Sequence, residues 1–516
     1  MLQFIAAGGG AFAYIPGIMT NMAKGFSCLF NLLNYLERSA DRFPDKIAFA
    51  DEKESLTFAQ LRDLGLRVGA AVVKSVEDIN LPVAVLTTHS VCDIAAFVGA
   101  LYAGCFYIPL DGGAPREFTE LRLETIKPAM TIEARSVSDL PCETPDMDIM
   151  KAIRSRILST DPAYAIFTSG STGAPKAALV SHGSVVNLAE WFYETFGFSE
   201  RVVFAAQAPF YFDASVKEIY STLRNGCTMH LLPKKLFISP LKVLRFVEEK
   251  GANVLPWAAA AVKMIANSGV FEQYIPGGVE DVIFGGENMP SSALNIWKRA
   301  MPDARFTNVY GPSETTVDSA YYTLDRELPD GVSVPIGRAC RNTGLLILDS
   351  GGKPVPAGEP GELYIQGAGV GLGYYGDPAR TTEAFMQNPL NPHYRDIVYR
   401  TGDIVKQNEY GELVFLARAD DQVKHMGSRI ELGEVESAAA GVDGIRLVCC
   451  IYDKEKLKIV MFYEGGVSEH DVSVSLNACL PRYMCPNLVI KLDEMPVTPN
   501  GKIDRVKVKE RYHENT

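Results

Sequence analysis

Short apolar runs alternate with helix-like stretches along most of the chain, and this order limits the possible folds more than any other feature of the sequence. Residues 83–86 are apolar, residues 94–102 have a helical pattern, and residues 103–111 return as a strand. Strands that alternate with helices form mostly parallel sheets whose two faces are covered by helices. The sequence therefore predicts an α/β fold, with a second unit of the same kind over residues 202–309.

The 516 residues are too many for one hydrophobic core, so we expect roughly two to four domains. Short strands predicted at 47–50 and 56–58 open the first α/β unit. Beyond residue 335, apolar runs separated by Gly and Pro predict a small β-rich subdomain, and helix and strand patterns start again after residue 420. We therefore expect a loose tail or an upstream start over 1–25, an N-terminal domain with two α/β sheet subdomains and the β-rich subdomain over 26–419, and a small α+β C-terminal domain over 420–516.

Charge and cysteine content exclude several classes of protein. The net charge of −12 argues against nonspecific binding to nucleic acid or to an anionic membrane. Residues 2–19 are uncharged, but a run of three glycines, a proline and the lack of preceding basic residues make them a poor signal peptide or membrane span. Ten cysteines lie scattered without a CxxC pair, so we expect no zinc site, no disulfide framework and a cytoplasmic protein.

Residues 166–176 are rich in small and hydroxylated side chains and end in a single cation, Lys176. The apolar run over 163–167 predicts a buried strand, and the glycines that follow allow backbone N–H groups and hydroxyls to surround one anion. The P-loop motif is excluded, because there the lysine is preceded by Gly and followed by Ser or Thr, whereas Pro175 and Ala177 flank Lys176. A loop that holds phosphates and an ordinary surface turn both remain open at this point.

Four further stretches accompany this loop in the order and near the spacing of a known family. They are residues 308–316, 399–403, 418–434 and 500–505. With them the chain, from about residue 26 to 505, resembles the adenylate-forming superfamily, most closely the amino-acid adenylation domains of nonribosomal peptide synthetases and the D-alanine:carrier-protein ligases. The resemblance implies an ATP-dependent, AMP-forming ligase whose C-terminal domain is mobile.

The resemblance implies a first half-reaction in which a carboxylate attacks the α-phosphate of ATP, giving an acyl-AMP anhydride and pyrophosphate. Charge that accumulates on phosphate oxygens needs positioned donors, a cation and Mg²⁺. Glu314 is implied as the Mg²⁺ ligand, Asp403 with Arg418 as the ribose site, Tyr310 as the side chain that stacks on adenine, and Lys502 as the catalytic lysine. The phosphate loop is implied to consist of Thr168, Ser169, Gly170, Ser171, Thr172, Gly173 and Lys176.

The second half-reaction of this family is attack on the adenylate by the phosphopantetheine thiol of a carrier protein. The resemblance implies that the C-terminal domain rotates about a hinge at Asp420 to remove Lys502. Residues 422–429 then face the active centre and help to form the thiol tunnel.

The substrate pocket of the family opens with Asp213, which is implied to bind the α-ammonium group of an amino acid. Without the family resemblance, the residues alone favour Asp213 as a helix N-cap and Lys217 as its partner on the surface one turn later. The implied pocket residues are Asp213, Ala214, Lys217, Ala258, Ile283, Gly285, Val309, Val317, Asp318 and Lys502. Lys217 weakly favours glutamate, although Ala258 departs from that pattern; if Lys217 and Asp318 neutralise each other, a small neutral residue such as alanine fits.

We therefore expect a stand-alone amino-acid adenylating ligase that uses ATP and Mg²⁺ and acts on a separate carrier protein, since no carrier segment follows Arg505. The alternatives are a D-alanine:carrier-protein ligase and an acyl- or aryl-CoA ligase of the same superfamily, and Asp213 argues against the latter. A non-enzymatic scaffold would lack Lys176, Glu314, Asp403 or Lys502, and all four are present.

Overall fold

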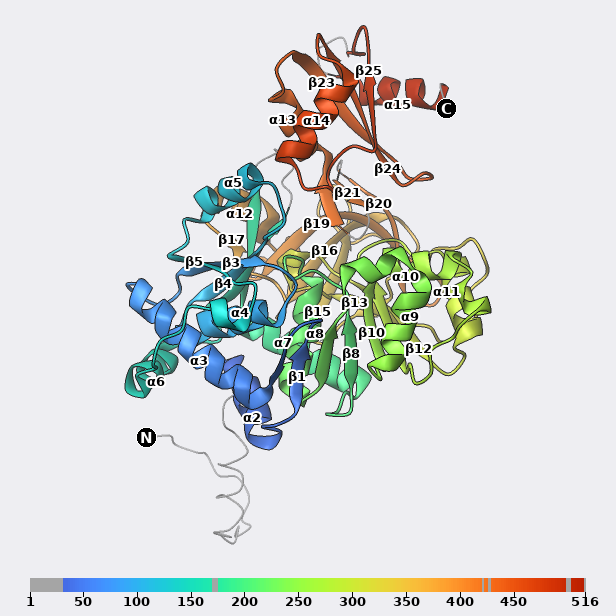
Figure 1. The fold of residues 1–516 in the computed structure, drawn as a ribbon. Helices are drawn as coiled ribbons and strands as arrows, with labels where there is room; N and C mark the ends of the chain where they lie inside the picture. Colours follow the sequence, from blue (N-terminus) through green and yellow to red (C-terminus); the bar gives the residue numbers. More distant parts are fainter. Residues whose placement is uncertain (1–30, 169–174, 420–421, 426–427, 498–502, 515–516) are drawn as a thin grey trace.

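The structure, a computed structural model, describes residues 31–168, 175–419, 422–425, 428–497 and 503–514. Two large sheets flanked by helices form the body of the molecule, and the C-terminal part stands at one end of it (Figure 1). Within the described residues, no helix is long and apolar enough to cross a membrane.

A six-stranded sheet carries the strand that leads into the predicted phosphate loop. Its order is β17-β7-β6-β4-β3-β5, in which β3 to β6 run parallel, while β7 pairs antiparallel with both β6 and β17. The strands are β3 (Pro82–Thr87), β4 (Phe106–Asp111), β5 (Met130–Glu133), β6 (Pro162–Thr168), β7 (Lys176–Ser181) and β17 (Gly373–Tyr374). The helices in this region are α3 (Phe58–Ser75), α4 (Val91–Tyr102), α5 (Arg116–Ile126) and α6 (Met147–Arg156).

A nine-stranded sheet forms the second α/β unit, with the order β14-β13-β12-β11-β10-β8-β9-β1-β2. Its strands are β1 (Ile47–Ala50), β2 (Ser55–Thr57), β8 (Val203–Ala206), β9 (Thr228–Leu231), β10 (Val254–Ala258), β11 (Asp281–Gly285), β12 (Arg305–Tyr310), β13 (Ala320–Thr323) and β14 (Arg338–Ala339). The helices in this region are α7 (His182–Phe196), α8 (Ala214–Asn225), α9 (Pro240–Glu249), α10 (Ala259–Asn267) and α11 (Ser291–Ala300). Both large sheets are thus parallel in their centres, as predicted, but antiparallel strands lie at one edge of the six-stranded sheet and at both edges of the nine-stranded sheet.

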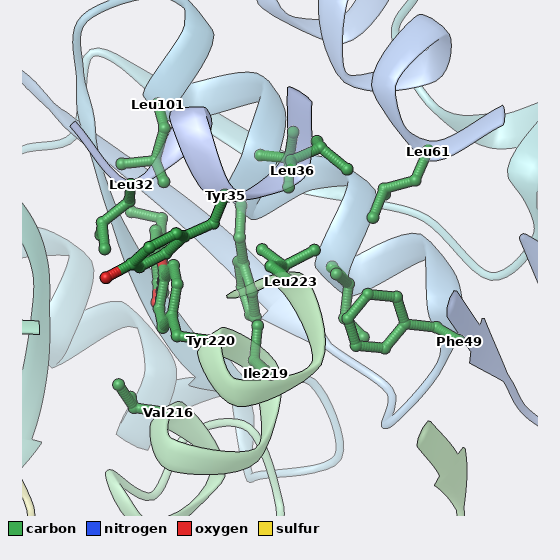
Figure 2. Close-up of a cluster of buried hydrophobic side chains, with 14 of the residues drawn as sticks. Leu32, Tyr35, Leu36, Phe49, Leu61, Leu101, Val216, Ile219, Tyr220 and Leu223 are labelled. Atoms are coloured by element: carbon green, nitrogen blue, oxygen red, sulfur yellow. Dashed lines mark hydrogen bonds between the residues drawn. The ribbon is translucent and has the colours of Figure 1, made fainter. Parts of the chain in front are cut away.

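One expectation about the first unit is wrong, because β1 and β2 belong to the nine-stranded sheet. Strand β1 runs parallel to β9, with Phe49 opposite Met229. The cause is helix α2 (Leu33–Arg42), which packs on α8 and so brings the following strand to the β9 edge. Figure 2 shows this contact, in which Leu32 and Leu36 lie with Ile219 and Leu223 in one buried cluster.

Helix α8 begins immediately after Asp213 and presents a buried stripe that includes Val216, Ile219, Tyr220 and Leu223. It ends before Gly226, whose φ of +71° is the left-handed conformation that closes many helices. Because the stripe is fixed in the core, the first two turns of α8 hold Asp213 and Lys217 in set positions.

The predicted β-rich subdomain is a five-stranded antiparallel sheet. Its strands are β15 (Thr343–Leu348), β16 (Gly361–Gly367), β18 (Phe385–Gln387), β19 (Ile397–Gln407) and β20 (Leu413–Arg418), and α12 (Pro378–Ala384) lies in the same stretch.

The C-terminal part contains the pair β21 (Gln422–His425) and β22 (Ser428–Glu431), then α13 (Leu432–Ala440), β23 (Ile445–Asp453), β24 (Lys458–Gly465), α14 (Glu469–Cys479), β25 (Leu488–Lys491) and α15 (Arg505–Glu514). The domain boundary expected at residue 420 stays a prediction, and residue 420 lies outside the described residues.

Candidate active site

A cavity of about 310 Å³ lies where the carboxyl ends of β6, β10, β11 and β12 meet the start of α8 and the β21–β22 pair. Ligands of open α/β sheets bind at such carboxyl ends. The predicted site residues that line the cavity are Thr168, Asp213, Ala214, Lys217, Ala258, Gly285, Val309, Tyr310, Val317, Asp318, Asp403 and Arg418. Residues spread over more than two hundred positions of the sequence are thus brought together.

Several predicted residues are not part of this lining. Ile283 is buried in β11, in the same hydrophobic cluster as Val309 and Val317, and is not among the described residues that line the cavity. Lys176 and Glu314 contact each other beside it. Ser169, Gly170, Ser171, Thr172, Gly173, Asp420 and Lys502 lie outside the described residues.

The predicted phosphate loop connects two antiparallel strands. Thr168 at the end of β6 is paired with Lys176 at the start of β7. A P-loop instead leads from a strand into a helix, so this pairing agrees with the exclusion of the P-loop from the residues around Lys176. The Oγ1 atom of Thr168 is buried and has no hydrogen-bond partner within the described part of the chain.

Glu314, in the short 3₁₀ turn Ser313–Thr315, is fully buried among positive and hydroxyl groups. The Tyr374 hydroxyl donates to its Oε1 at 2.9 Å, and Arg429 of β22 donates to its Oε2 at 2.8 Å. The Lys176 ammonium lies 3.7 Å from Oε1 and donates to the Tyr374 oxygen at 3.1 Å. Burial alone would raise the pKa of Glu314, but Arg429 and Lys176 outweigh burial and hold that pKa at about 2.

Asp403 and Arg418 face each other across the antiparallel strands β19 and β20. Arg418 donates to Asp403 Oδ1 at 2.7 Å and to the Thr401 carbonyl at 3.1 Å. The Tyr310 hydroxyl donates to the other carboxylate oxygen, Oδ2. Burial, together with the charge of Asp403, raises the pKa of Tyr310 well above its usual value, so Tyr310 stays a neutral donor.

At the start of α8, Asp213 occupies the N-cap position, but its carboxylate accepts no hydrogen bond from the helix N–H groups. It lines the cavity instead. Burial raises the pKa of Asp213, while Ser313 and the nearby Lys217 oppose that rise. The alternative interpretation of Asp213 as a capping residue with a surface partner is therefore wrong.

Lys217 is buried rather than exposed, and only 7% of its side chain is accessible. Its Nζ lies 3.5 Å from Oδ2 of Asp318, whose side chain is 4% accessible. Burial raises the pKa of Asp318 and Lys217 opposes that rise. Lys217 and Asp318, two of the charged residues in the predicted pocket, thus form a buried ion pair at the cavity wall.

The sequence motifs did not single out three residues that belong to this site. Arg429 and Lys424 are within residues 422–429, which were expected to face the active centre, but nothing in the sequence linked Arg429 to Glu314. Burial lowers the pKa of Lys424, whose Nζ lies 5.8 Å from the Tyr310 ring centre. Tyr374 carried no sequence signal, because its contact with Glu314 spans sixty positions.

The site fits ATP and Mg²⁺ by the chemistry of its side chains. The hydroxyl of Thr168, which has no partner among the described residues, is available to a phosphate oxygen, and Asp403 has the acceptor oxygens that ribose hydroxyls require. A carboxylate with a pKa of about 2 is ionised at neutral pH, and oxygen anions are the ligands that Mg²⁺ prefers. In the present arrangement Arg429 provides the positive charge next to Glu314.

Comparisons with known proteins agree with a nucleotide-binding site. The family model of AMP-binding enzymes matches residues 36–375. The chain is 33% identical over 500 residues to surfactin synthase subunit 1 of Bacillus subtilis (strain 168), an alignment that covers 92% of this chain and 14% of that protein. It is 31% identical over 511 residues to bacitracin synthase 1 of Bacillus licheniformis, covering 94% of this chain and 10% of that protein.

The fold is also that of solved structures. Holo-PA1221, an NRPS protein containing adenylation and PCP domains, superposes with a TM-score of 0.78 at 22% identity, over 94% of this chain and 85% of that one. This likeness shows the fold, and the curated relatives are much longer than this chain. Because the family match extends over more than half of its length, the chain belongs to the AMP-binding enzyme family of ATP-dependent, AMP-forming ligases.

Proposed function

We propose that the protein activates an α-amino acid with ATP and passes the aminoacyl group to the phosphopantetheine thiol of a carrier protein. The observation that supports an amino-acid substrate is Asp213, whose carboxylate faces the cavity and is not used as a helix cap. A carboxylate at the cavity wall attracts an ammonium group, whereas a fatty or aryl acid offers no positive charge to it. This favours an amino acid over the substrates of acyl- or aryl-CoA ligases.

In the adenylation step the carboxylate oxygen of the amino acid forms a bond to the α-phosphorus of ATP, and the bond to the β-phosphate oxygen breaks to release pyrophosphate. Asp213 holds the ammonium group, and Asp403, with Tyr310 and Arg418 fixing its orientation, holds the ribose hydroxyls. Thr168 and Lys176 flank the phosphate loop, and Lys502 is proposed to stabilise the α-phosphate oxygens. Glu314 would hold Mg²⁺, which when bound would supply Lewis-acid stabilisation of the phosphate charge.

In the proposed transfer step a thiol attacks the acyl carbon and AMP leaves. The described β21–β22 pair contributes Gln422, Lys424, Ser428 and Arg429 to the cavity wall. This position of β21–β22 at the cavity supports the assignment of the present orientation to thiol transfer rather than to adenylation.

The ion pair between Lys217 and Asp318 bears on the choice of amino acid. A lysine that already has an acidic partner has less need of a substrate carboxylate, and an extra buried anion is costly. The pair therefore supports a small neutral amino acid, such as alanine, over glutamate as the substrate. Glutamate stays a prediction that rests on Lys217 alone. The carrier protein, its expected separate location and the stereochemistry of the amino acid also stay predictions.

The cytoplasmic location expected from the scattered cysteines stays a prediction. Nine of the cysteines lie within the described residues, and no disulfide joins them there. Disulfides are rare in the cytoplasm, where thiols are kept reduced.

Trapping the activated acid tests the proposed reaction. The protein is incubated with ATP, Mg²⁺, hydroxylamine and each common L- and D-amino acid, and the hydroxamate is identified by mass spectrometry together with released pyrophosphate. We expect one small neutral amino acid to give the strongest signal. CoA-dependent consumption of a non-amino acid would support the CoA-ligase alternative, and a folded protein that activates no acid would support the scaffold.

A further inference from the structure

A buried ion pair joins the large N-terminal part of the molecule to its C-terminal part. Arg122 of α5 donates through Nη2 to Oε1 of Glu434 in α13 at 2.9 Å, and the two side chains are 8% and 7% exposed. The partners are 312 positions apart in the sequence. Figure 1 shows α5 at the edge of the body that faces the C-terminal part.

Apolar side chains enclose this pair. Phe118, one turn before Arg122 on α5, belongs to the same hydrophobic cluster as Ile430, Val435 and Leu476 of the C-terminal part. The Arg122 guanidinium carbon lies 3.3 Å from the centre of the Phe118 ring, and Arg122 Nη1 donates to the Phe118 carbonyl at 3.1 Å. One face of α5 therefore supplies both the charged and the apolar contact to the C-terminal part.

The pair is better suited to defining an orientation than to adding stability. Burial lowers the pKa of Arg122 and raises that of Glu434, and the attraction between them opposes both changes. Oε2 of Glu434 has no hydrogen-bond partner among the described residues. Buried pairs of this kind contribute little net stability, but removing one partner leaves a buried charge alone and is strongly unfavourable.

Glu434 is directly coupled to the cavity through the chain. Helix α13 begins immediately after β22, and Glu434 lies three residues beyond the last residue of that strand, Glu431. The other end of β22 carries Ser428 and Arg429, which line the cavity. When α13 is fixed on α5, the β21–β22 pair is held against the active site.

We propose that the Arg122–Glu434 pair is a latch that holds the C-terminal part in the orientation in which β21–β22 lines the cavity. Arg122 is thereby a positioning residue for thiol transfer, a role that rests on the proposed function, whereas the docking itself does not. If the C-terminal part rotates to bring Lys502 to the cavity, Glu434 leaves Arg122 and the latch opens. Adenylation therefore proceeds without the pair, and thiol transfer depends on it.

Four variants of the full chain test the latch. Arg122→Met and Glu434→Gln each remove one charge, and Arg122→Met combined with Glu434→Leu replaces the pair by apolar side chains. Arg116→Leu is the matched control, because Arg116 lies on the same helix in an exposed i,i+4 pair with Glu120. Thermal unfolding of each variant confirms that it is folded.

Two readouts separate positioning from a general structural effect. The first compares two rates, that of ATP–pyrophosphate exchange and that of single-turnover transfer of the aminoacyl group from its adenylate to pantetheine. The second is hydrogen exchange of residues 422–425 and 428–431 without substrates, which reports docking even if the proposed reaction is wrong. We expect Arg122→Met to slow transfer on the order of 10²-fold and Glu434→Gln to slow it less, with pyrophosphate exchange unchanged within about twofold.

Both single variants should also speed hydrogen exchange of β21–β22, while the apolar double variant restores protection and Arg116→Leu matches the wild type. The latch is refuted if Arg122→Met transfers to pantetheine at the wild-type rate with unchanged protection of β21–β22. It is also refuted if Arg116→Leu causes the same loss, because the effect would then belong to α5 in general. Faster hydrogen exchange of β21–β22 in folded Arg122→Met would support the docking role of the pair even if the protein has no adenylation activity.

Discussion

Glu314 is proposed to have a different positively charged partner in each of the two half-reactions. Its carboxylate is proposed to bind Mg²⁺ during adenylation, and in the present structure it is paired with Arg429 and Lys176. Arg429 thus provides a positive charge at a carboxylate that would otherwise be buried without sufficient compensation. In the proposed cycle the same carboxylate would serve both stages, with Arg429 beside it in the present orientation and Mg²⁺ during adenylation.

The depressed pKa of Glu314 gives a prediction about stability and pH. A carboxyl group whose pKa falls from 4.5 to about 2 on folding stabilises the native state above pH 4.5, and this contribution is lost as the pH falls toward 2. The contribution is on the order of 3 kcal/mol. Denaturant unfolding at pH 5, 4 and 3 should show a smaller acid-induced loss of stability in Glu314→Gln than in the wild type. Equal losses in both proteins would contradict the assigned environment of Glu314.

The ion pair between Lys217 and Asp318 makes a second prediction at this scale. Lys217→Ala leaves Asp318 buried without its partner, and we expect it to lower the free energy of unfolding by about 3 kcal/mol. Lys217→Met combined with Asp318→Leu should recover most of that loss, because the buried charge is removed with its partner. Denaturant unfolding at neutral pH measures both. A double variant no more stable than Lys217→Ala would argue against the pair.

Among the structural elements, α8 connects the core to the substrate side of the site. Its C-terminal glycine, Gly226, has a φ of +71°, and a Cβ built there would lie 2.5 Å from Cδ2 of Phe43. Gly197 closes α7 with nearly the same φ, +69°, but a Cβ there meets no atom within 4 Å. A comparison of alanine substitutions at the two glycines therefore separates the cost of backbone strain from the cost of steric overlap with Phe43.

We expect Gly197→Ala to lower the free energy of unfolding by about 1 kcal/mol through its left-handed conformation alone. Gly226→Ala should cost about 1–3 kcal/mol more, because Phe43 must move. Thermal or denaturant unfolding of the two variants gives the comparison. If both lose the same stability, the contact with Phe43 is not a constraint on α8.

The local elements of this chain were largely predictable from sequence, and the pairing of the elements was not. The helical pattern over 94–102 lies within α4, and the strand predicted over 163–167 lies within β6. The sheet that accepts β1 could not be inferred, because it depends on α2 packing against a helix almost two hundred positions later. Periodicity reports which face of an element is apolar and carries no information about its distant partner.

The same limit applies to the candidate site. The family resemblance points to Glu314, but two of the side chains that contact its carboxylate, Arg429 and Tyr374, were not singled out by any sequence motif. The burial of Lys217 was the opposite of what an isolated helix position suggests, since an aspartate and a lysine at i and i+4 are normally solvated. Tertiary burial decides such cases, and the sequence alone left both interpretations open.

On the scale of the whole molecule, the C-terminal part has to occupy two positions if both half-reactions occur at one cavity. In the structure it is docked through β21–β22, α13 and the contact with α5. The catalytic role proposed for Lys502 belongs to the other position. This division predicts that residues of the C-terminal part affect one half-reaction and spare the other.

Lys502→Ala tests that division. We expect it to slow adenylation on the order of 10²-fold or more, because a donor to the developing phosphate charge is lost. Transfer to pantetheine from a supplied aminoacyl-AMP should stay near the wild-type rate, since Lys502 acts before the rotation. Rapid-quench measurement of each half-reaction separates the two effects. A variant that loses both rates equally would contradict a role limited to adenylation.

The most direct test of the proposed function is amino-acid-dependent exchange of labelled pyrophosphate into ATP, measured over all common L- and D-amino acids with the wild type and Asp213→Asn. We expect exchange with at least one α-amino acid, lowered roughly 10²-fold in Asp213→Asn because the charged contact to the ammonium group is lost. A folded wild-type protein that exchanges with none of these amino acids would contradict amino-acid adenylation. Equal exchange by both proteins would contradict the role of Asp213.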